Sequence, residues 1–379
     1  MEGSRSNEKQ LMQILMRITD PRRRKVQHPL INILFIGFCA MVAGCDDFVS
    51  MAMFGESHRK WFEKYLDLSK GIPSHDRFNA LFSAIKPEEF ERCLVEWIQI
   101  IHEFTEGQVV AIDGKTLRRS FDKATGKKAI HMVSAWATEN RIALGQVVTD
   151  EKSNEIEAIP RLLEILEIKG CLVTIDAMGC QVEIADKILE KGANYLLHVK
   201  GNQPALQKAI HDHFVKVFES KPGETKPKVL IQETTEKGHG REEKRQFLMT
   251  KVPPKDPVFL RWPHLKGIGL VRSETVRDGK TTEQVKYYIM SRVLPIKKYA
   301  NAVRAHWGIE NRLHWQLDVS FGEDACRVRK GNADINLAHL RRIAVSKLKN
   351  EKTVKAGVKN KRLAAGWNPD YILKVLFAK

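Results

Sequence analysis

The chain has 379 residues, of which 43% are hydrophobic, enough to bury a substantial core and to form two or three domains. It carries 63 Lys and Arg against 46 Asp and Glu, a formal net charge of +17, and this balance favours a polyanionic partner. The composition excludes a disordered chain, and the absence of any Cys-x-x-Cys pair among the six cysteines argues against a zinc ribbon. Charge alone leaves DNA, RNA and an anionic membrane surface open.

The first hundred residues have a helical pattern. The apolar stretch from Leu30 to Gly44 is shorter than the about 20 residues of a membrane span and contains Asn32, so it predicts a buried helix. The basic run Arg22 to Lys25 suits a solvated turn and a phosphate contact equally well. The expected helices, punctuated by prolines, lie near 7–18, 29–44, 46–66, 75–85 and 87–104.

From Gln108 the chain becomes a mixture of strands and helices, a mixed α/β pattern. Alternating and short apolar runs predict strands, and apolar residues at helical spacing predict helices. The expected strands are 109–113, 129–137, 142–149, 171–175 and 195–199, and the expected helices are 155–168, 182–191 and 204–218.

Residues 220–292 form a further β-rich block. Within it two expected strands, 267–276 and 282–291, flank Asp278-Gly279, a strong hairpin signal. After Pro295 we expect a helix through about Leu317. The remainder predicts a helix near 335–349, a basic stretch at 349–362 and a short helix after Pro369.

Three acidic residues stand out as candidates for chemistry. Asp113 and Asp176 each follow an apolar strand, where a carboxylate is costly unless it is solvated, paired or bound to a metal. A single aspartate at such a place is more often a turn residue, but two at strand ends of one sheet can converge on one site. Glu310 is the third candidate, since it shares a helix face with His306 and His314 at four-residue spacing.

The motifs that contain these residues resemble those of the H-repeat-associated insertion-sequence transposases, which are DDE transposases. The resemblance runs through nearly the whole chain, including DPRRRKVQHPL (20–30) and PSHDRF (73–78). The other matching strings are AIDGKTLRRS (111–120), TIDAMGCQ (174–181), YLLHVKGNQP (195–204), GHGREEKR (238–245) and HWGIENRLHWQLDVSFGEDACRVRKGNA (306–333).

The resemblance implies a ribonuclease H-like mixed five-stranded sheet with a β-rich insertion, plus an all-α N-terminal domain. The implied domains are a helical, DNA-binding domain at 1–105, a catalytic domain at 106–340 with its insertion at about 220–292, and a basic helical tail at 341–379. Asp113, Asp176 and Glu310 would be both the catalytic residues and the ligands of Mg²⁺, with Mn²⁺ as a substitute. We expect the two aspartates on adjacent strands, Glu310 on a helix, and a raised pKa for at least one of the three acids, since like charges share the site.

The partners implied by the resemblance are the DNA ends of an element and a target DNA, bound by a homodimer or larger assembly in the cytoplasm, associated with the nucleoid. Arg241 and Arg245 share one side of an expected strand with Glu243 and suit DNA contact, although a solvated edge strand would look the same. The sequence departs from many relatives in having His306, Val303 and Leu317 at the places of an Arg, a Tyr and a Lys. The full set of candidate DNA contacts is Lys115, Arg118, Arg119, Arg241, Arg245, His306, Arg312 and Lys330.

Two alternatives remain at this point. One is a catalytically silent DNA-binding protein derived from a transposase, and the other is a ribonuclease H-like nuclease that does not join strands. The presence of all three acids argues against simple decay but does not demonstrate activity.

Overall fold

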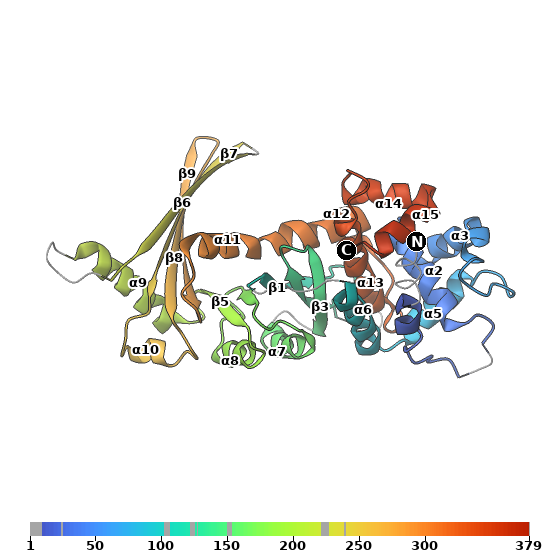
Figure 1. Ribbon diagram of the computed structural model, residues 1–379, viewed down its shortest axis with the longest axis horizontal. Helices are drawn as coiled ribbons and strands as arrows, with labels where there is room; N and C mark the ends of the chain where they lie inside the picture. The colour runs from blue at the N-terminus through green and yellow to red at the C-terminus, as the bar shows by residue number, and fades with distance from the viewer. Residues whose placement is uncertain are drawn as a thin grey trace. The chain divides into compact units, whose positions relative to one another are not determined.

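The computed structural model describes residues 10–23, 26–101, 107–121, 126, 128–149, 154–220, 227–238 and 240–378. The protein is mixed α/β, with a large mixed sheet and many helices (Figure 1). The chain divides into two compact units, each assembled from segments that are distant in the sequence. Unit 1 comprises Met1–Phe104, Gly114–Asn154 and Glu310–Lys379, and unit 2 comprises Thr105–Asp113 and Glu155–Ile309.

Unit 2 contains most of the sheet, with the strand order β1-β4-β5-β9-β8-β7-β6. β1, β4 and β5 are parallel, β9 is antiparallel to β5, and β6 to β9 form an antiparallel ribbon. The β-rich block of the sequence therefore continues the same sheet through the β5–β9 pairing. The bounds are β1 (Val109–Thr116), β4 (Leu172–Ile175), β5 (Asn194–Val199), β6 (Leu230–Gly238), β7 (Arg241–Lys251), β8 (Gly267–Arg277) and β9 (Lys280–Met290).

Two helices of unit 2, α9 (Pro204–Glu219) and α11 (Ile296–His306), pack against opposite faces of the ribbon (Figure 1). Tyr299 of α11 lies so close under Gly269 of β8 that a Cβ there would be 2.4 Å from its hydroxyl, so only glycine fits. Nδ1 of His211 in α9 is 2.9 Å from the hydroxyl of Tyr287 in β9. The next residue of β9, Tyr288, points to the other face and packs against Tyr299 of α11. The other helices of unit 2 are α7 (Glu155–Ile165), α8 (Val182–Glu190) and α10 (Pro257–Leu260).

Unit 1 is mainly helical and is built around α13 (Ala333–Asn350). This helix packs against helices from both ends of the chain and against β3. Its neighbours are α2 (Leu30–Val42), α5 (His75–Ala84), α6 (Pro87–Ile101), α12 (Trp315–Phe321), α14 (Val358–Trp367), α15 (Pro369–Leu376) and β3 (Ile142–Thr149), which pairs with β2 (His131–Ala137).

Polar side chains fix the position of α13 in this core. Asn336 donates to the carbonyl of Phe82 at 2.8 Å, and Ser346 accepts from the backbone N–H of Ala143 at 2.9 Å. Arg342 and Glu323, both almost fully buried, form an ion pair at 2.8 Å. These interactions offset part of the cost of burying the charged face of α13.

Most helices and strands lie where the sequence predicted them, and α2 is the buried helix expected from its apolar residues. Across the described ranges no helix is long and apolar enough to cross a membrane. The expected single helix at 46–66 is broken at His58 into α3 (Phe48–Ser57) and α4 (Arg59–Phe62). Arg22 forms an ion pair with Asp20 at 2.6 Å, whereas Arg24 and Lys25 lie outside the described residues.

Two features of unit 1 differ from the sequence expectation. The helix expected through Leu317 is interrupted by a π-helical turn, η2 (Glu310–His314). The stretch expected to be a basic tail contains α14, whose Lys361 and Arg362 are buried and paired. Helix α13 crosses residue 340, where the sequence predicted a domain boundary. The division of the chain into three domains stays a prediction.

Candidate active site

Asp113 lies in β1, and Asp176 directly follows β4, the neighbouring parallel strand of unit 2, so the two aspartates come from adjacent strands as expected from the sequence. Ile112 of β1 pairs with Ile175 of β4, so the two aspartates follow paired residues. The Asp176 carboxylate accepts hydrogen bonds from the N–H of Met178 at 3.1 Å and of Gly179 at 3.5 Å. Both acids therefore belong to the same edge of the parallel part of the sheet.

The turn after β4 has little room. A Cβ at Gly179 would lie 2.3 Å from a methyl carbon of Ile175, so a larger residue would push the turn away from the strand end. Glycine thus allows the backbone N–H groups to reach the Asp176 carboxylate.

His306 lies at the end of α11, next to β4. Its Nδ1 is 3.1 Å from the hydroxyl of Thr174. Burial lowers the pKa of His306 to about 4, and the opposing effect of Asp176 is smaller. His306 is therefore neutral at pH 7, so any contact with a phosphate would be a hydrogen bond and not an ion pair.

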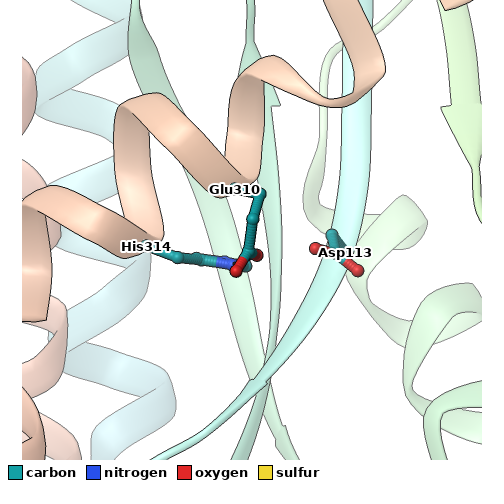
Figure 2. Close-up of side chains that lie close together, drawn as sticks. All are labelled: Asp113, Glu310 and His314. Carbon is teal, nitrogen blue, oxygen red and sulfur yellow. Dashed lines mark hydrogen bonds and ion pairs between the residues drawn. The ribbon is translucent and has the colours of Figure 1, made fainter. Parts of the chain in front are cut away.

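Glu310 and His314 form a pair across the π turn of unit 1 (Figure 2). His314 Nδ1 is 2.8 Å from a carboxylate oxygen of Glu310, and the side chain of Glu310 is 62% exposed while that of His314 is buried. This hydrogen bond lowers the pKa of Glu310, and the charge of Lys115 contributes in the same direction. The expectation of a raised pKa is therefore wrong for Glu310, which is held in its ionised form.

His314 had no role predicted from the sequence, although its spacing placed it on the face of Glu310. Carboxylate oxygen and imidazole nitrogen are both common metal ligands. Its four-residue spacing was the available signal, and its burial in the π turn could not be read from the sequence.

Lys115 lies among three carboxylates in unit 1, of which one is buried and two are partly exposed. Its Nζ is 2.6 Å from Asp318, 3.1 Å from Asp324 and 3.4 Å from Glu323, and its side chain is only 9% exposed. Glu323 is in turn paired with Arg342. The charge of Lys115 is thus compensated within the protein.

The other candidate DNA contacts differ in solvent exposure and in whether their side chains are paired within the protein. Arg245 is mostly buried and pairs with Glu243 at 2.6 Å and with Glu236 at 2.9 Å. Arg312 donates to the carbonyl of Thr138 at 3.4 Å, although its side chain is exposed. The exposed members of the set are Arg118, Arg119, Arg241, Arg312 and Lys330.

Several known proteins are similar in sequence to this chain over nearly its whole length. The family described as "Transposase DDE domain" matches residues 105–346, and "DDE_Tnp_1-associated" matches residues 12–98. "Putative transposase YncI" of Escherichia coli O157:H7 is 44% identical over 97% of this chain and 94% of its own length. "H repeat-associated putative transposase YhhI" of Escherichia coli K12 is 41% identical over 97% of this chain and 98% of its own.

A shorter relative, "Inactive transposase YbfQ" of Escherichia coli K12, is 36% identical over 18% of this chain. The resemblance inferred from the sequence motifs is confirmed by these matches.

Proposed function

The chain belongs to the transposases with a DDE domain, and we propose that it cuts DNA at the ends of an insertion element and joins those ends to a target in a metal-dependent reaction. The observation that carries the proposal is that Asp113 lies in β1 and Asp176 directly follows the adjacent parallel strand β4, inside the matched domain. Asp113, Asp176 and Glu310 are the proposed catalytic carboxylates.

The donor chemistry suits a hard divalent cation, Mg²⁺ or Mn²⁺, because carboxylate oxygens are its preferred ligands. Within unit 1, Glu310 and His314 are two side chains that could contribute to holding a metal ion (Figure 2). When bound, divalent ions make a water or a DNA 3′ hydroxyl a better nucleophile and stabilise the charge on the oxygens around phosphorus.

The residues of the chain prepare this chemistry. His314 orients the Glu310 carboxylate and favours its ionised form, as supporting residues do around metal ligands. The N–H groups of Met178 and Gly179 hold the Asp176 carboxylate at the strand end. Glu310 can thus bind a cation without first losing a proton at neutral pH.

A ribonuclease H-like arrangement is part of the proposal. β1 is shared by the order β3-β2-β1 in unit 1 and the order β1-β4-β5 in unit 2, which supports a five-stranded sheet of that kind. The helical domain at 1–105 is proposed to bind DNA, and the active form to be a homodimer or larger assembly on DNA in the nucleoid.

The ribbon of unit 2 offers a charged surface for DNA. Residues that pair across β6 to β9 point to the same side, so each face of the ribbon can be read from the strand register. We call the side that contacts α11 the α11 face and the opposite side the α9 face. From the tips inward to the level of Phe247, the α11 face carries Arg241, Arg245, Arg277, Lys280 and Lys286 against Glu236 and Glu243.

Over the same rows, acidic residues outnumber basic residues on the α9 face. On the α11 face, Arg241, Arg277 and Lys280 are adjacent in one row at the tip of the ribbon. Like charges placed side by side across strands repel one another. A DNA backbone would relieve that repulsion. The charged residues of the α9 face are Lys237, Lys244 and Arg272 against Glu233, Glu242, Glu274 and Glu283.

The test of the proposed function is strand cleavage by acid variants. D113N, D176N and E310Q should each abolish cleavage and joining of a labelled element end in Mg²⁺ or Mn²⁺ and leave DNA affinity largely intact, because binding rests on basic side chains. D212N, which changes a surface carboxylate paired with Lys208 on α9, is the matched control and should cut normally.

The outcomes separate the alternatives. Cleavage at near wild-type rate by any of the three variants would remove that acid from the site. Binding without cleavage by the wild-type protein would favour a silent DNA-binding protein, and cleavage without joining would favour a nuclease.

A further inference from the structure

The π turn that carries Glu310 and His314 is an unusual local structure. In a π turn each N–H bonds the carbonyl five residues back, so one extra residue is accommodated and the regular ladder is interrupted. Such a turn persists only when its surroundings hold it. The interactions around η2 in unit 1 therefore bear on how Glu310 is presented.

Lys349, near the end of α13, reaches this turn. Its Nζ donates a hydrogen bond to the backbone carbonyl of Arg312, the middle residue of the turn. The ammonium also lies 5.4 Å from the centre of the Trp136 ring on β2, a fully buried side chain. Trp136 and the carbonyl thus fix the ammonium from two directions.

The part of α13 that carries Lys349 is itself held in place by polar contacts. About one turn earlier on α13, Ser346 is bonded to the backbone of β3, and about two turns earlier Arg342 is paired with Glu323. On its other side, the Arg312 side chain donates to the carbonyl of Thr138, which follows β2. The π turn is therefore tethered by its middle residue to two fixed parts of unit 1.

We propose that Lys349 is a positioning residue, which holds the π turn through the Arg312 carbonyl and so keeps Glu310 and His314 in the geometry needed to bind a divalent cation. The inference rests on the proposed function, which makes Glu310 a metal ligand. Without the tether, the turn can relax to regular α-helix by a shift of one residue, which rotates Glu310 by about 100° relative to α12.

The same helix provides a matched control. Lys347 is also on α13, donates to the carbonyl of Ala378 at 2.7 Å and lies 5.2 Å from the centre of the Trp97 ring. Burial lowers the pKa of Lys347 and of Lys349 to about 7. The two lysines thus share their helix, their type of aromatic neighbour and their type of acceptor, but only Lys349 bonds to the π turn.

The experiment compares K349M, K349R and K347M in the full chain. Hydrogen–deuterium exchange of the amides at 310–318 reports on the turn, isothermal titration with Mn²⁺ alone reports on the metal site, and the melting temperature reports on stability. We expect K349M to speed exchange in this segment and to weaken Mn²⁺ binding by about 10-fold or more, the usual effect of losing a residue that supports a ligand.

K347M should lower the melting temperature and leave exchange at 310–318 and Mn²⁺ affinity as in the wild type. K349R keeps a cationic hydrogen-bond donor, so it should retain most of the slow exchange at 310–318 and most of the Mn²⁺ affinity. Equal exchange and equal Mn²⁺ affinity in K349M and K347M would overturn the proposal. Should K349M fail to fold, the milder pair K349Q and K347Q gives the same comparison.

Failure of the proposed function has a different signature. A wild-type protein that binds no Mn²⁺ and whose E310Q variant behaves identically would refute the assignment of Glu310 as a ligand. The exchange data would still decide whether Lys349 holds the turn, because they depend on neither metal nor DNA.

Discussion

Glu351 ends α13 and joins it to the two helices that follow. Its carboxylate accepts hydrogen bonds from the N–H of Thr353 at 2.5 Å, the N–H of Val354 at 3.3 Å and the hydroxyl of Tyr371 at 2.5 Å. Burial by itself would raise the pKa of Glu351, but the hydrogen bonds from Thr353 and Tyr371 outweigh it and lower the pKa to about 2. One side chain thus makes the C-terminal helices sensitive to acid.

The sign of that sensitivity follows from the direction of the shift. The pKa in the folded state is below the ordinary 4.5, so the stabilisation is fully present above about pH 4.5 and is lost as the pH falls towards 2. We expect E351Q to lower the free energy of unfolding by about 1–3 kcal/mol at pH 7 and to reduce its dependence on pH below 4.5.

Urea unfolding followed by tryptophan fluorescence at several pH values would measure this effect. E63Q, which removes an exposed ion pair with Arg59, should change little and serves as the control. An unchanged pH dependence in E351Q would show that the carboxylate is not the acid-sensitive group.

The candidate acids could be predicted from the sequence, but their partners could not. Asp113 and Asp176 were visible because an acid directly after an apolar strand is unusual. Lys115 was expected to contact DNA, since a charged residue beside a catalytic motif usually faces solvent. Its carboxylate partners are about two hundred residues away, and sequence spacing does not show such pairs.

At the scale of elements, the ribbon of β6 to β9 allows a sharp test because its two faces differ in charge. R277E and K280E together reverse two charges on the α11 face, and K237E and K244E reverse two on the α9 face. Both double variants change the net charge equally, so only the place of the change differs.

We expect the α11-face variant to bind DNA more weakly and with a salt dependence shallower by about 0.9 for each phosphate that is no longer neutralised. The α9-face variant should stay close to wild type in fluorescence anisotropy titrations. Equal weakening in the two variants would mean that net charge, and not this face, governs affinity.

Periodic elements were predicted well, whereas their interruptions were not. The hairpin at Asp278-Gly279 and the parallel strands have strong local signals, and both are found. The π turn has none, since a one-residue insertion in a helix leaves its apolar spacing almost unchanged. α14 was missed because its lysine and arginine suggested solvent exposure, whereas Asp46 and Glu351 allow their burial.

For the molecule as a whole, the net charge of +17 predicts strongly salt-dependent binding to DNA. The logarithm of the association constant should fall linearly with the logarithm of salt concentration, with a slope of about −0.9 per phosphate neutralised. Anisotropy titrations between about 50 and 200 mM salt would measure it. A flat dependence would point to a partner other than nucleic acid.

The central place of α13 has a consequence for how the protein is made. The N-terminal helices α2, α5 and α6 pack on a helix that the ribosome synthesises more than two hundred residues later. At about 5–20 residues per second, roughly 10–50 s pass between the end of α6 and the start of α13. Throughout this interval α2, α5 and α6 lack the helix on which they pack in the finished protein, so the core of unit 1 is completed only after α13 has been made. An mRNA truncated before the codons of α13 would accordingly yield N-terminal helices that lack the central helix of unit 1.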